Sequence, residues 1–190
     1  MAPAPSPSLL DARRGALVLV DYQSRLMPAI DGSASVLEHG VFLGSLARLL
    51  DVPAFGTEEN PSSLGPNDER IAALCGHTLA KTSFDACGDG LGAHLRAGDR
   101  SVEQVVVAGC EAHVCLLQTS LGLLREGFAV FVVPDACGSR RPQDKALAMQ
   151  RLAQAGAVLA TPEMVAFEWL RTCDHARFRD VLALVKALPG

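Results

Sequence analysis

Three residues in separate parts of the chain have the side chains that a covalent hydrolase needs. Cys115 lies where an apolar run, residues 104–108, leads into a helical segment. We expect backbone N–H groups and the positive end of the helix dipole to favour its thiolate form. Asp21 follows an apolar strand, where burial makes a carboxylate a stronger base, and Lys81 lies at a strand end. A thiol, a base and a cation together predict acyl transfer through a cysteine nucleophile.

A tight turn beside the cysteine offers a further part of such a site. Gly109, Cys110 and Glu111 stand between the apolar run and the helical segment. Main-chain N–H groups in a turn of this kind could stabilise the oxyanion that develops during acyl transfer.

Each of these residues also has a purely structural explanation. An Asp after a strand is often a turn former or a helix cap, and a single Lys is most often a solvated surface residue. Cysteine is commonly a small core residue. We expect that role for the other cysteines, which are Cys75, Cys87, Cys110, Cys137 and Cys173.

Three more polar residues are candidates for substrate binding: Gln23, Glu59 and His113. His113 stands two residues before Cys115, and residues two apart on a helix point away from each other. We therefore expect His113 to line the pocket and not to form a Cys–His pair. Glu58 and Glu59 could cap a helix or hydrogen-bond to pocket residues, and the sequence does not decide between these roles.

The fold must bring these separated residues together at strand ends. Apolar or β-branched runs predict strands over residues 16–20, 53–57, 79–84, 104–108, 129–133 and 157–160. Apolar residues at helical spacing predict helices over residues 36–50, 90–97, 115–126, 142–155, 162–170 and 175–188. Residues 58–67 are predicted to form a loop. Alternating strands and helices predict a mainly parallel sheet with helices on both faces, which binds ligands at the carboxyl ends of its strands.

Composition limits the domain organisation and the partners. The 190 residues, 49% of them hydrophobic, suffice for one domain, which we place at residues 9–190 after a flexible tail at residues 1–8. A net charge of -4, without a Lys/Arg cluster, disfavours nucleic acid and membrane surfaces as partners. No apolar run approaches the roughly 18 residues of a membrane span, and the N-terminus lacks signal-peptide features. Six cysteines without a C-x-x-C pair indicate reduced thiols and a cytoplasmic location.

The chain resembles the isochorismatase-like cysteine hydrolase superfamily in segments that occur in the family's order. They are ALVLVDYQ (16–23), TEENPSSLG (57–65), KTSFDA (81–86), GCEAHVC (109–115) and VFVVPDACGSR (130–140). Within the superfamily, GCEAHVCLLQT followed by LREGF and VPDACGSR is most similar to the isochorismatase domain-containing proteins.

The resemblance implies a Rossmann-like three-layer α/β sandwich and a catalytic triad of Asp21, Lys81 and Cys115. It implies a non-proline cis peptide bond at Cys110–Glu111, which would aim the N–H groups of Glu111 and Cys115 at one oxygen. In the implied mechanism, Asp21 takes the thiol proton and Cys115 attacks an amide-like carbonyl carbon to form an acyl-enzyme. Family members are usually dimers or larger, so a homo-oligomer is expected.

Departures from relatives bear on cofactor and substrate. Nicotinamidases of this superfamily have an Asp/His metal site after the second strand, whereas residues 51–80 offer only His77. We therefore expect no metal ion and no other cofactor. Relatives commonly have Gln and an aromatic residue where Glu59 and Asn60 stand, so we expect a different pocket floor.

Three hypotheses from different classes follow. We favour a cysteine hydrolase of a small amide or related carbonyl compound. The alternative is a catalytically silent family member that acts as a binding or scaffold protein. A nucleotide-binding protein is disfavoured, because LVLVDYQSR stands after the first strand in place of a G-x-G-x-x-G motif.

Overall fold

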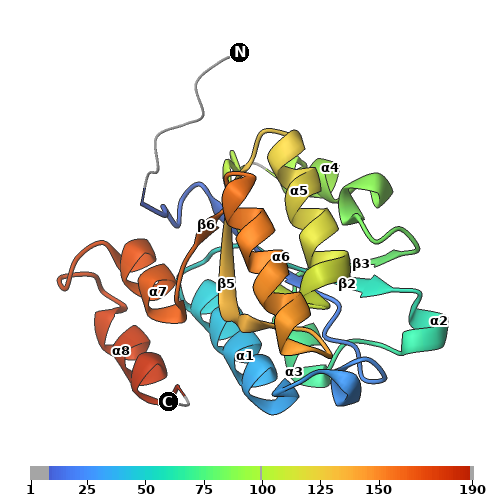
Figure 1. Ribbon diagram of the computed structural model, residues 1–190. Helices are drawn as coiled ribbons and strands as arrows, with labels where there is room; N and C mark the ends of the chain where they lie inside the picture. Colours follow the sequence, from blue (N-terminus) through green and yellow to red (C-terminus); the bar gives the residue numbers. More distant parts are fainter. Residues whose placement is uncertain (1–8, 99, 189–190) are drawn as a thin grey trace.

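A parallel sheet forms the centre of the computed structural model, which describes residues 9–98 and 100–188 (Figure 1). Its strands are β1 (Gly15–Val20), β2 (Ala54–Glu59), β3 (His77–Lys81), β4 (Gln104–Cys110), β5 (Ala129–Gly138) and β6 (Val158–Leu159). They lie in the order β3-β2-β1-β4-β5-β6, and each neighbouring pair is parallel. The predicted α/β class and parallel sheet are confirmed. The expected tail at residues 1–8 lies outside the described residues.

Helices cover both faces of the sheet and complete the predicted three-layer sandwich (Figure 1). One face, whose core includes Leu17 and Leu19, is covered by α1 (Ser33–Leu49), α7 (Pro162–Leu170) and α8 (Phe178–Lys186). The other face, whose core includes Val18 and Val20, is covered by α4 (Leu91–Arg96), α5 (Leu117–Arg125) and α6 (Pro142–Gln154). Because successive strand residues point to opposite faces, β1 must be apolar throughout to fill both cores.

Short helical turns link these elements. They are the 3₁₀ turns η1 (Met27–Ala29) and η2 (Ala86–Asp89), the π-helical turn η3 (Ala112–Leu116), and the helices α2 (Pro61–Leu64) and α3 (Glu69–Ala72). The prediction of a loop over residues 58–67 is therefore wrong in part. Glu58 and Glu59 complete β2, and α2 follows at once.

Two strands differ from the sequence prediction, whereas the other elements agree to within about three residues at each end. The strand predicted over residues 79–84 is β3 over residues 77–81, because its register with β2 ends at the pair Glu59 and Lys81. The strand predicted over residues 129–133 continues to Gly138. Beyond an irregularity, β5 pairs with β4 again, with Cys110 opposite Gly138.

The strand order reverses direction between β1 and β4, and the carboxyl ends of these two strands lie side by side. Val20 pairs there with Gly109, whose φ is 139°. A Cβ atom on Gly109 would clash with the carbonyl oxygen of Val20, so only glycine permits this approach. Asp21 and Glu111 therefore leave the sheet next to each other, at the switch point where parallel α/β folds bind ligands.

All six cysteines are free, as predicted. The expected core position fits Cys110 and Cys137, which are fully buried, and is wrong for Cys173, which is exposed. Among the described residues, no helix combines the length and apolar character needed to span a bilayer.

Candidate active site

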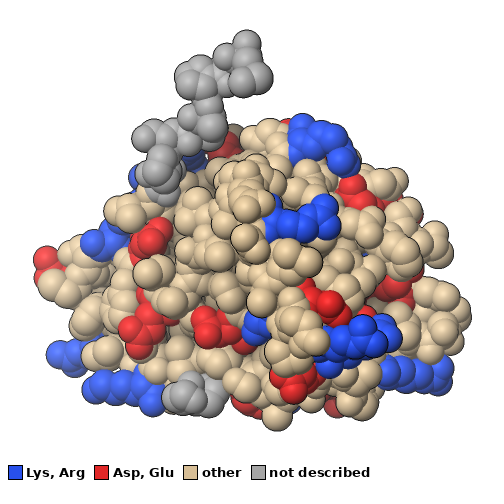
Figure 2. All heavy atoms as spheres, viewed as in Figure 1, with Lys and Arg blue, Asp and Glu red and all other residues tan. Residues whose placement is uncertain are grey.

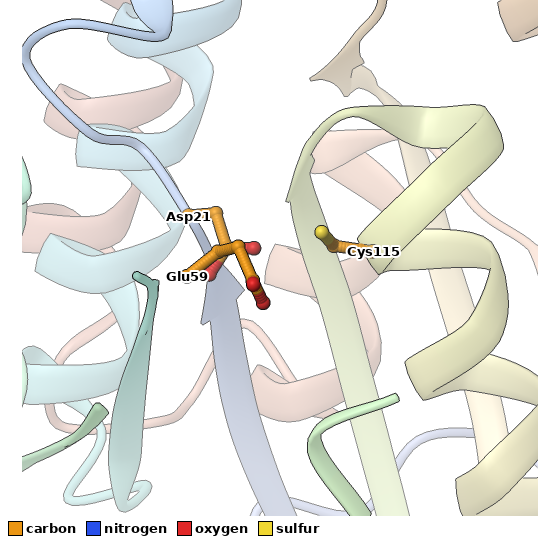
Figure 3. A group of neighbouring side chains, drawn as sticks. All are labelled: Asp21, Glu59 and Cys115. Atoms are coloured by element: carbon orange, nitrogen blue, oxygen red, sulfur yellow. The ribbon is translucent and has the colours of Figure 1, made fainter. Parts of the chain in front are cut away.

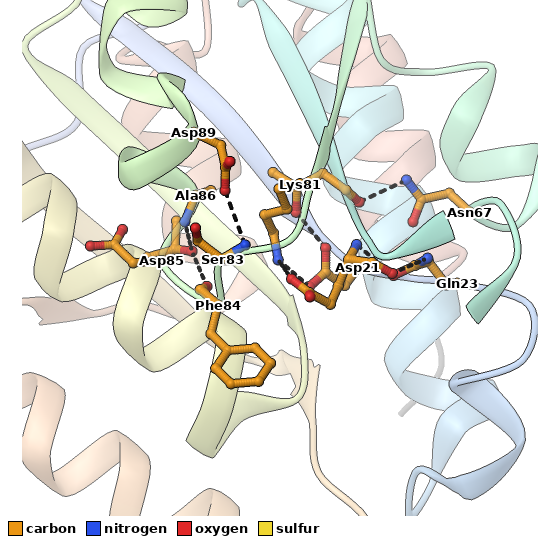
Figure 4. Close-up of polar contacts among 12 residues, drawn as sticks. Asp21, Gln23, Asn67, Lys81, Ser83, Phe84, Asp85, Ala86 and Asp89 are labelled. Atoms are coloured by element: carbon orange, nitrogen blue, oxygen red, sulfur yellow. Dashed lines mark hydrogen bonds and ion pairs between the residues drawn. The ribbon is translucent and has the colours of Figure 1, made fainter. Parts of the chain in front are cut away.

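The ammonium of Lys81 holds two carboxylates together at the carboxyl ends of neighbouring strands (Figure 4). Lys81 Nζ donates hydrogen bonds to Asp21 Oδ2 at 2.9 Å and to Glu59 Oε2 at 2.8 Å. The side chains of Lys81 and Asp21 are completely buried. Burial works against the charged ammonium, but the charge of Asp21 and the hydrogen bonds to Glu59 and Asp21 outweigh it, and the pKa of Lys81 is raised. Lys81 is therefore a buried cation at neutral pH.

Asp21 is fixed by contacts to β2. Its backbone N–H donates to the carbonyl oxygen of Thr57 at 3.2 Å, and Thr57 Oγ1 donates to Asp21 Oδ1 at 2.6 Å. The backbone of Asp21 has a φ of 52°, in the left-handed region that residues with a Cβ rarely adopt. The sequence alone does not single out Thr57. The available signal is its spacing of two from Glu59, because such residues share one face of a strand.

Cys115 faces both carboxylates (Figure 3). Its Sγ and one carboxylate oxygen each of Asp21 and Glu59 all lie within 4.8 Å of one another. The structure thus brings together Asp21, Lys81 and Cys115, which the sequence places far apart. Cys115 lies in η3, ahead of α5, and is 6% exposed.

The expected thiolate form of Cys115 is wrong. Burial and the neighbouring charge of Asp21 raise the pKa of the Cys115 thiol far above its usual range, although Lys81 opposes this shift. The resting side chain is therefore a protonated thiol. It needs a proton acceptor before it can react as a nucleophile.

The side chains of Asp21, Glu59 and Cys115 each offer one atom that could bind a metal ion, and the three atoms are close enough to share one. Lys81 Nζ, however, already donates to both Asp21 and Glu59 and supplies a positive charge there. His77 begins β3, at the opposite end of the strand from Lys81, and its ring stacks on that of His94 with centroids 4.7 Å apart. His77 therefore lies apart from the possible metal ligands at the other end of the strand. That the site works without a metal ion stays a prediction.

The turn that precedes Cys115 is tied to the end of β5. The Cys110–Glu111 peptide bond is cis. The buried carboxylate of Glu111 accepts hydrogen bonds from Arg140 Nε at 3.1 Å, Nη2 at 2.7 Å and the backbone N–H at 3.0 Å. Burial alone would raise the pKa of Glu111, but the bonds from Arg140 outweigh it and the pKa is lowered. The sequence does not reveal this pairing, although Arg140 ends one of the segments that resemble the family.

Gln23 supports the site through the backbone. Its Nε2 donates to the carbonyl oxygens of Glu59 at 3.0 Å and Gly65 at 2.6 Å, and its Oε1 accepts from the Glu59 N–H at 2.9 Å. Gln23 is fully buried and positions the end of β2. A direct role in substrate binding stays a prediction.

His113 lies beside the end of β5 and the start of α6. Its Nδ1 is 3.0 Å from Ser139 Oγ, and its Nε2 is 3.9 Å from Asp144 Oδ2. These contacts agree with the expectation that His113 forms no direct pair with Cys115. Its predicted place in the lining of a substrate pocket stays a prediction.

Known proteins share both the sequence pattern and the fold. The family model described as "Isochorismatase domain" matches residues 15–164. The isochorismatase domain-containing protein 2A of Mus musculus is 34% identical over 170 residues, which are 90% of this chain and 82% of that protein. The isochorismatase domain-containing protein 2 of Danio rerio is 32% identical and aligns over 93% of this chain and 89% of that protein.

Solved structures agree with this likeness. A structure described as the MAR1 ribonuclease from Caenorhabditis elegans has a TM-score of 0.90 and 30% identity, covering 96% of this chain and 95% of that chain. The YcaC gene product of Escherichia coli, described as an octameric hydrolase of unknown specificity, has a TM-score of 0.82 and 25% identity over 97% of this chain and 100% of that chain. The chain therefore belongs to the isochorismatase family.

Proposed function

We propose that the protein is a cysteine-dependent hydrolase of a small amide or related carbonyl compound. The observation that supports this most is the buried Lys81 ammonium, which bridges Asp21 and Glu59 directly beside the thiol of Cys115. Membership of the isochorismatase family supports hydrolysis at a coarse level.

Asp21 is the proposed base. Because the raised pKa of Cys115 keeps the thiol protonated, its proton must leave as the S–C bond forms. An Asp21 oxygen lies within 4.8 Å of Cys115 Sγ, which makes this carboxylate the proposed acceptor, and Thr57 and Lys81 hold its two oxygens in place. The carbonyl carbon becomes tetrahedral, and its oxyanion would accept hydrogen bonds from the N–H groups of Glu111 and Cys115.

The second half of the reaction reuses the same carboxylate. Asp21 passes its proton to the leaving nitrogen, the C–N bond breaks and a thioester remains on Cys115. Water then gives a proton to Asp21 and attacks the thioester, which releases the acid and returns the thiol. Lys81, whose raised pKa keeps it charged, stabilises the carboxylate whenever it is ionised.

Ammonia release from a panel of small amides tests this function. We expect turnover with at least one neutral amide, its loss in Cys115→Ala, and retention in Cys173→Ala, which removes an exposed thiol. Intact-mass measurement after rapid acid quench should show an acyl adduct that maps to Cys115. Ammonia release that persists in Cys115→Ala would exclude covalent catalysis by this residue.

A silent binding or scaffold protein is the second candidate. The near-complete burial of Asp21, Lys81 and Cys115 favours it, because these groups have little access to a substrate in the structure. Such a protein would show no turnover and no adduct across the amide panel while remaining folded by circular dichroism. Detection of either would exclude it.

The Caenorhabditis elegans relative, described as a ribonuclease, suggests adding RNA to the panel. On the face shown in Figure 2, basic and acidic side chains are interspersed and separated by uncharged surface. This face and the net charge of -4 offer little attraction to a phosphate backbone. We therefore propose that nucleic acid is not a partner, and cleavage of a labelled RNA that is lost in Cys115→Ala would contradict this.

We also propose a homo-oligomer in the cytoplasm. The Escherichia coli relative is described as octameric, and free cysteines fit a reducing compartment. Light scattering coupled to gel filtration measures the oligomeric state directly, and a monomer at working concentration would contradict the proposed homo-oligomer.

A further inference from the structure

We infer that the site selects neutral carboxamides against carboxylates, and that Glu59 sets this selectivity. The inference rests on the proposed function, in which Cys115 is the nucleophile, and names the class of substrate that the nucleophile meets. It follows from the charges, the hydrogen bonds and the position of Glu59.

The charges around Cys115 do not balance. Asp21 and Glu59 are two carboxylates, and both accept hydrogen bonds from the single ammonium of Lys81. A second charged pair at this edge, Glu111 with Arg140, is balanced within itself. The cluster beside Cys115 therefore has an excess negative charge in a place with almost no water to screen it.

Glu59 is the member of the cluster that an incoming molecule meets first. Its side chain is 11% exposed, whereas those of Asp21 and Lys81 are 0% exposed. Both oxygens of Asp21 have donors, Thr57 Oγ1 and Lys81 Nζ. Within the described part of the chain, Glu59 Oε2 has Lys81 as its donor, and Oε1 has none. Glu59 Oε1 is thus an acceptor that a substrate N–H group can fill.

A carboxamide satisfies these conditions and a carboxylate does not. The amide group is uncharged, and its N–H groups can donate to Glu59 Oε1 while its carbonyl carbon approaches Cys115 Sγ, within 4.8 Å of a Glu59 oxygen. A carboxylate has no hydrogen to donate and brings a like charge into a buried site, where repulsion is several times stronger than in water. The same repulsion would help to expel the acid product.

Two thiol reagents of nearly equal shape measure this selectivity without turnover. Iodoacetamide and iodoacetate each form a bond from sulfur to their methylene carbon, with loss of iodide and of the thiol proton. The rate ratio at Cys115, followed by peptide mass spectrometry, is divided by the ratio at a neutral free thiol, with the exposed Cys173 as an internal control. We expect iodoacetamide to be favoured at Cys115 by about tenfold or more relative to the free thiol.

Glu59→Gln and Glu58→Gln form a matched pair of variants. The Glu59→Gln side chain would keep an oxygen for Lys81 but remove the excess charge, so we expect the preference to fall several-fold. Glu58 is the neighbouring residue on the opposite face of β2, where its Oε1 accepts from the N–H of Asn67 at 2.8 Å. Removing that charge should leave the ratio unchanged, and circular dichroism checks that both variants are folded.

The outcomes separate this inference from the proposed function. A ratio at Cys115 equal to that of the free thiol, a ratio that Glu59→Gln does not change, or no labelling of Cys115 by iodoacetamide would each overturn the selectivity. A catalytically silent protein would still show the preference, since alkylation needs no turnover. If the protein hydrolyses amides but the ratio of the two alkylation rates at Cys115 equals that of the free thiol, the proposed function stands. Glu59 would then not determine its selectivity.

Discussion

The two ends of the sheet differ in openness and in chemistry. At the amino ends, a cavity of about 530 Å³ is lined by Pro53 and Val102, which precede β2 and β4, and by exposed Arg48 and Asp51. At the carboxyl ends, the charged cluster around Cys115 has almost no exposed surface. The open hollow and the convergent reactive groups are therefore at opposite ends of the molecule.

This difference shows that pairing and burial, and not the size of a hollow, mark the candidate site. Charges that line the open cavity are in contact with water, which weakens their effect on one another. The carboxylates of Asp21 and Glu59 share a desolvated ammonium, and Asp21, with a smaller contribution from Glu59, raises the pKa of Cys115. Four predictions test whether the two ends differ in this way.

The largest expected effect is on turnover. Asp21 and Asp51 both have left-handed backbones, with φ values of 52° and 55°, a conformation that Asn tolerates well. Asp21→Asn removes the proposed base, and we expect kcat/KM to fall by about a thousandfold. Asp51→Asn, in the open cavity, should leave kcat/KM within about twofold. Equal losses in an amide hydrolysis assay would remove the distinction between the two ends.

The second-largest expected effect is on the free energy of unfolding. Lys81→Met leaves two buried carboxylates without their cation, which we expect to destabilise the fold by about 3–5 kcal/mol. Arg48→Met in the cavity should change the free energy of unfolding by less than about 0.5 kcal/mol. Urea denaturation of the two variants measures both values. Adding Glu59→Gln to Lys81→Met should recover part of the loss, and no recovery would argue against a shared charge.

The pH dependence of alkylation should separate Cys115 from an ordinary thiol. Because its pKa is raised, the neutral thiol persists through the mildly alkaline range. We expect its rate with iodoacetamide to rise by about tenfold per pH unit from about pH 7 to about pH 9, while a free thiol levels off near its pKa of about 8.5. Peptide mass mapping follows the rate, and a plateau for Cys115 below about pH 8.5 would contradict the raised pKa.

The smallest expected effect is a loss of stability at the Glu111 turn, beside Cys115. Arg140→Gln removes two of the three hydrogen bonds to the buried Glu111 carboxylate, and we expect a loss of about 1–2 kcal/mol at about pH 7. The folded-state pKa of Glu111 is lowered, so the pairing stabilises the protein above the unfolded pKa of about 4.3 and is lost as pH falls. The difference between wild type and variant in urea should therefore shrink below about pH 4. If this difference in stability does not change with pH, the loss arises from packing and not from the ion pair.

Most of the fold was predictable from the sequence, because its central strands are almost entirely apolar. The runs that became β1 and β4 are apolar except for Gln104, as expected of parallel strands buried on both faces. The end of β5 was not predictable, because Pro134 and Asp135 resemble a turn and the strand continues only through renewed pairing with β4. Such pairing depends on residues far apart in the sequence.

The meeting of three residues of the candidate site was predictable from the sequence, whereas the electrostatics of the site were not. Asp21 and Lys81 stand out because they follow or end strands, Cys115 because it lies between a strand and a helix, and parallel strands align those ends. The protonated state of Cys115 follows from burial and from a carboxylate brought in by another strand, whereas the sequence suggests only the helix dipole. Thr57 and Arg140 likewise act through partners 36 and 29 residues away.

The close approach of Gly109 to Val20 fixes how far apart β1 and β4 can lie at the candidate site. The backbones of β1 and β4 fix the spacing between Asp21 and the Glu111 turn, so a side chain at position 109 would have to push these two strands apart. The charge beside Cys115, in contrast, depends in part on Glu59 of β2, a strand that lies outside the β1–β4 contact. Spacing and charge at the candidate site are therefore set by different strands of the sheet.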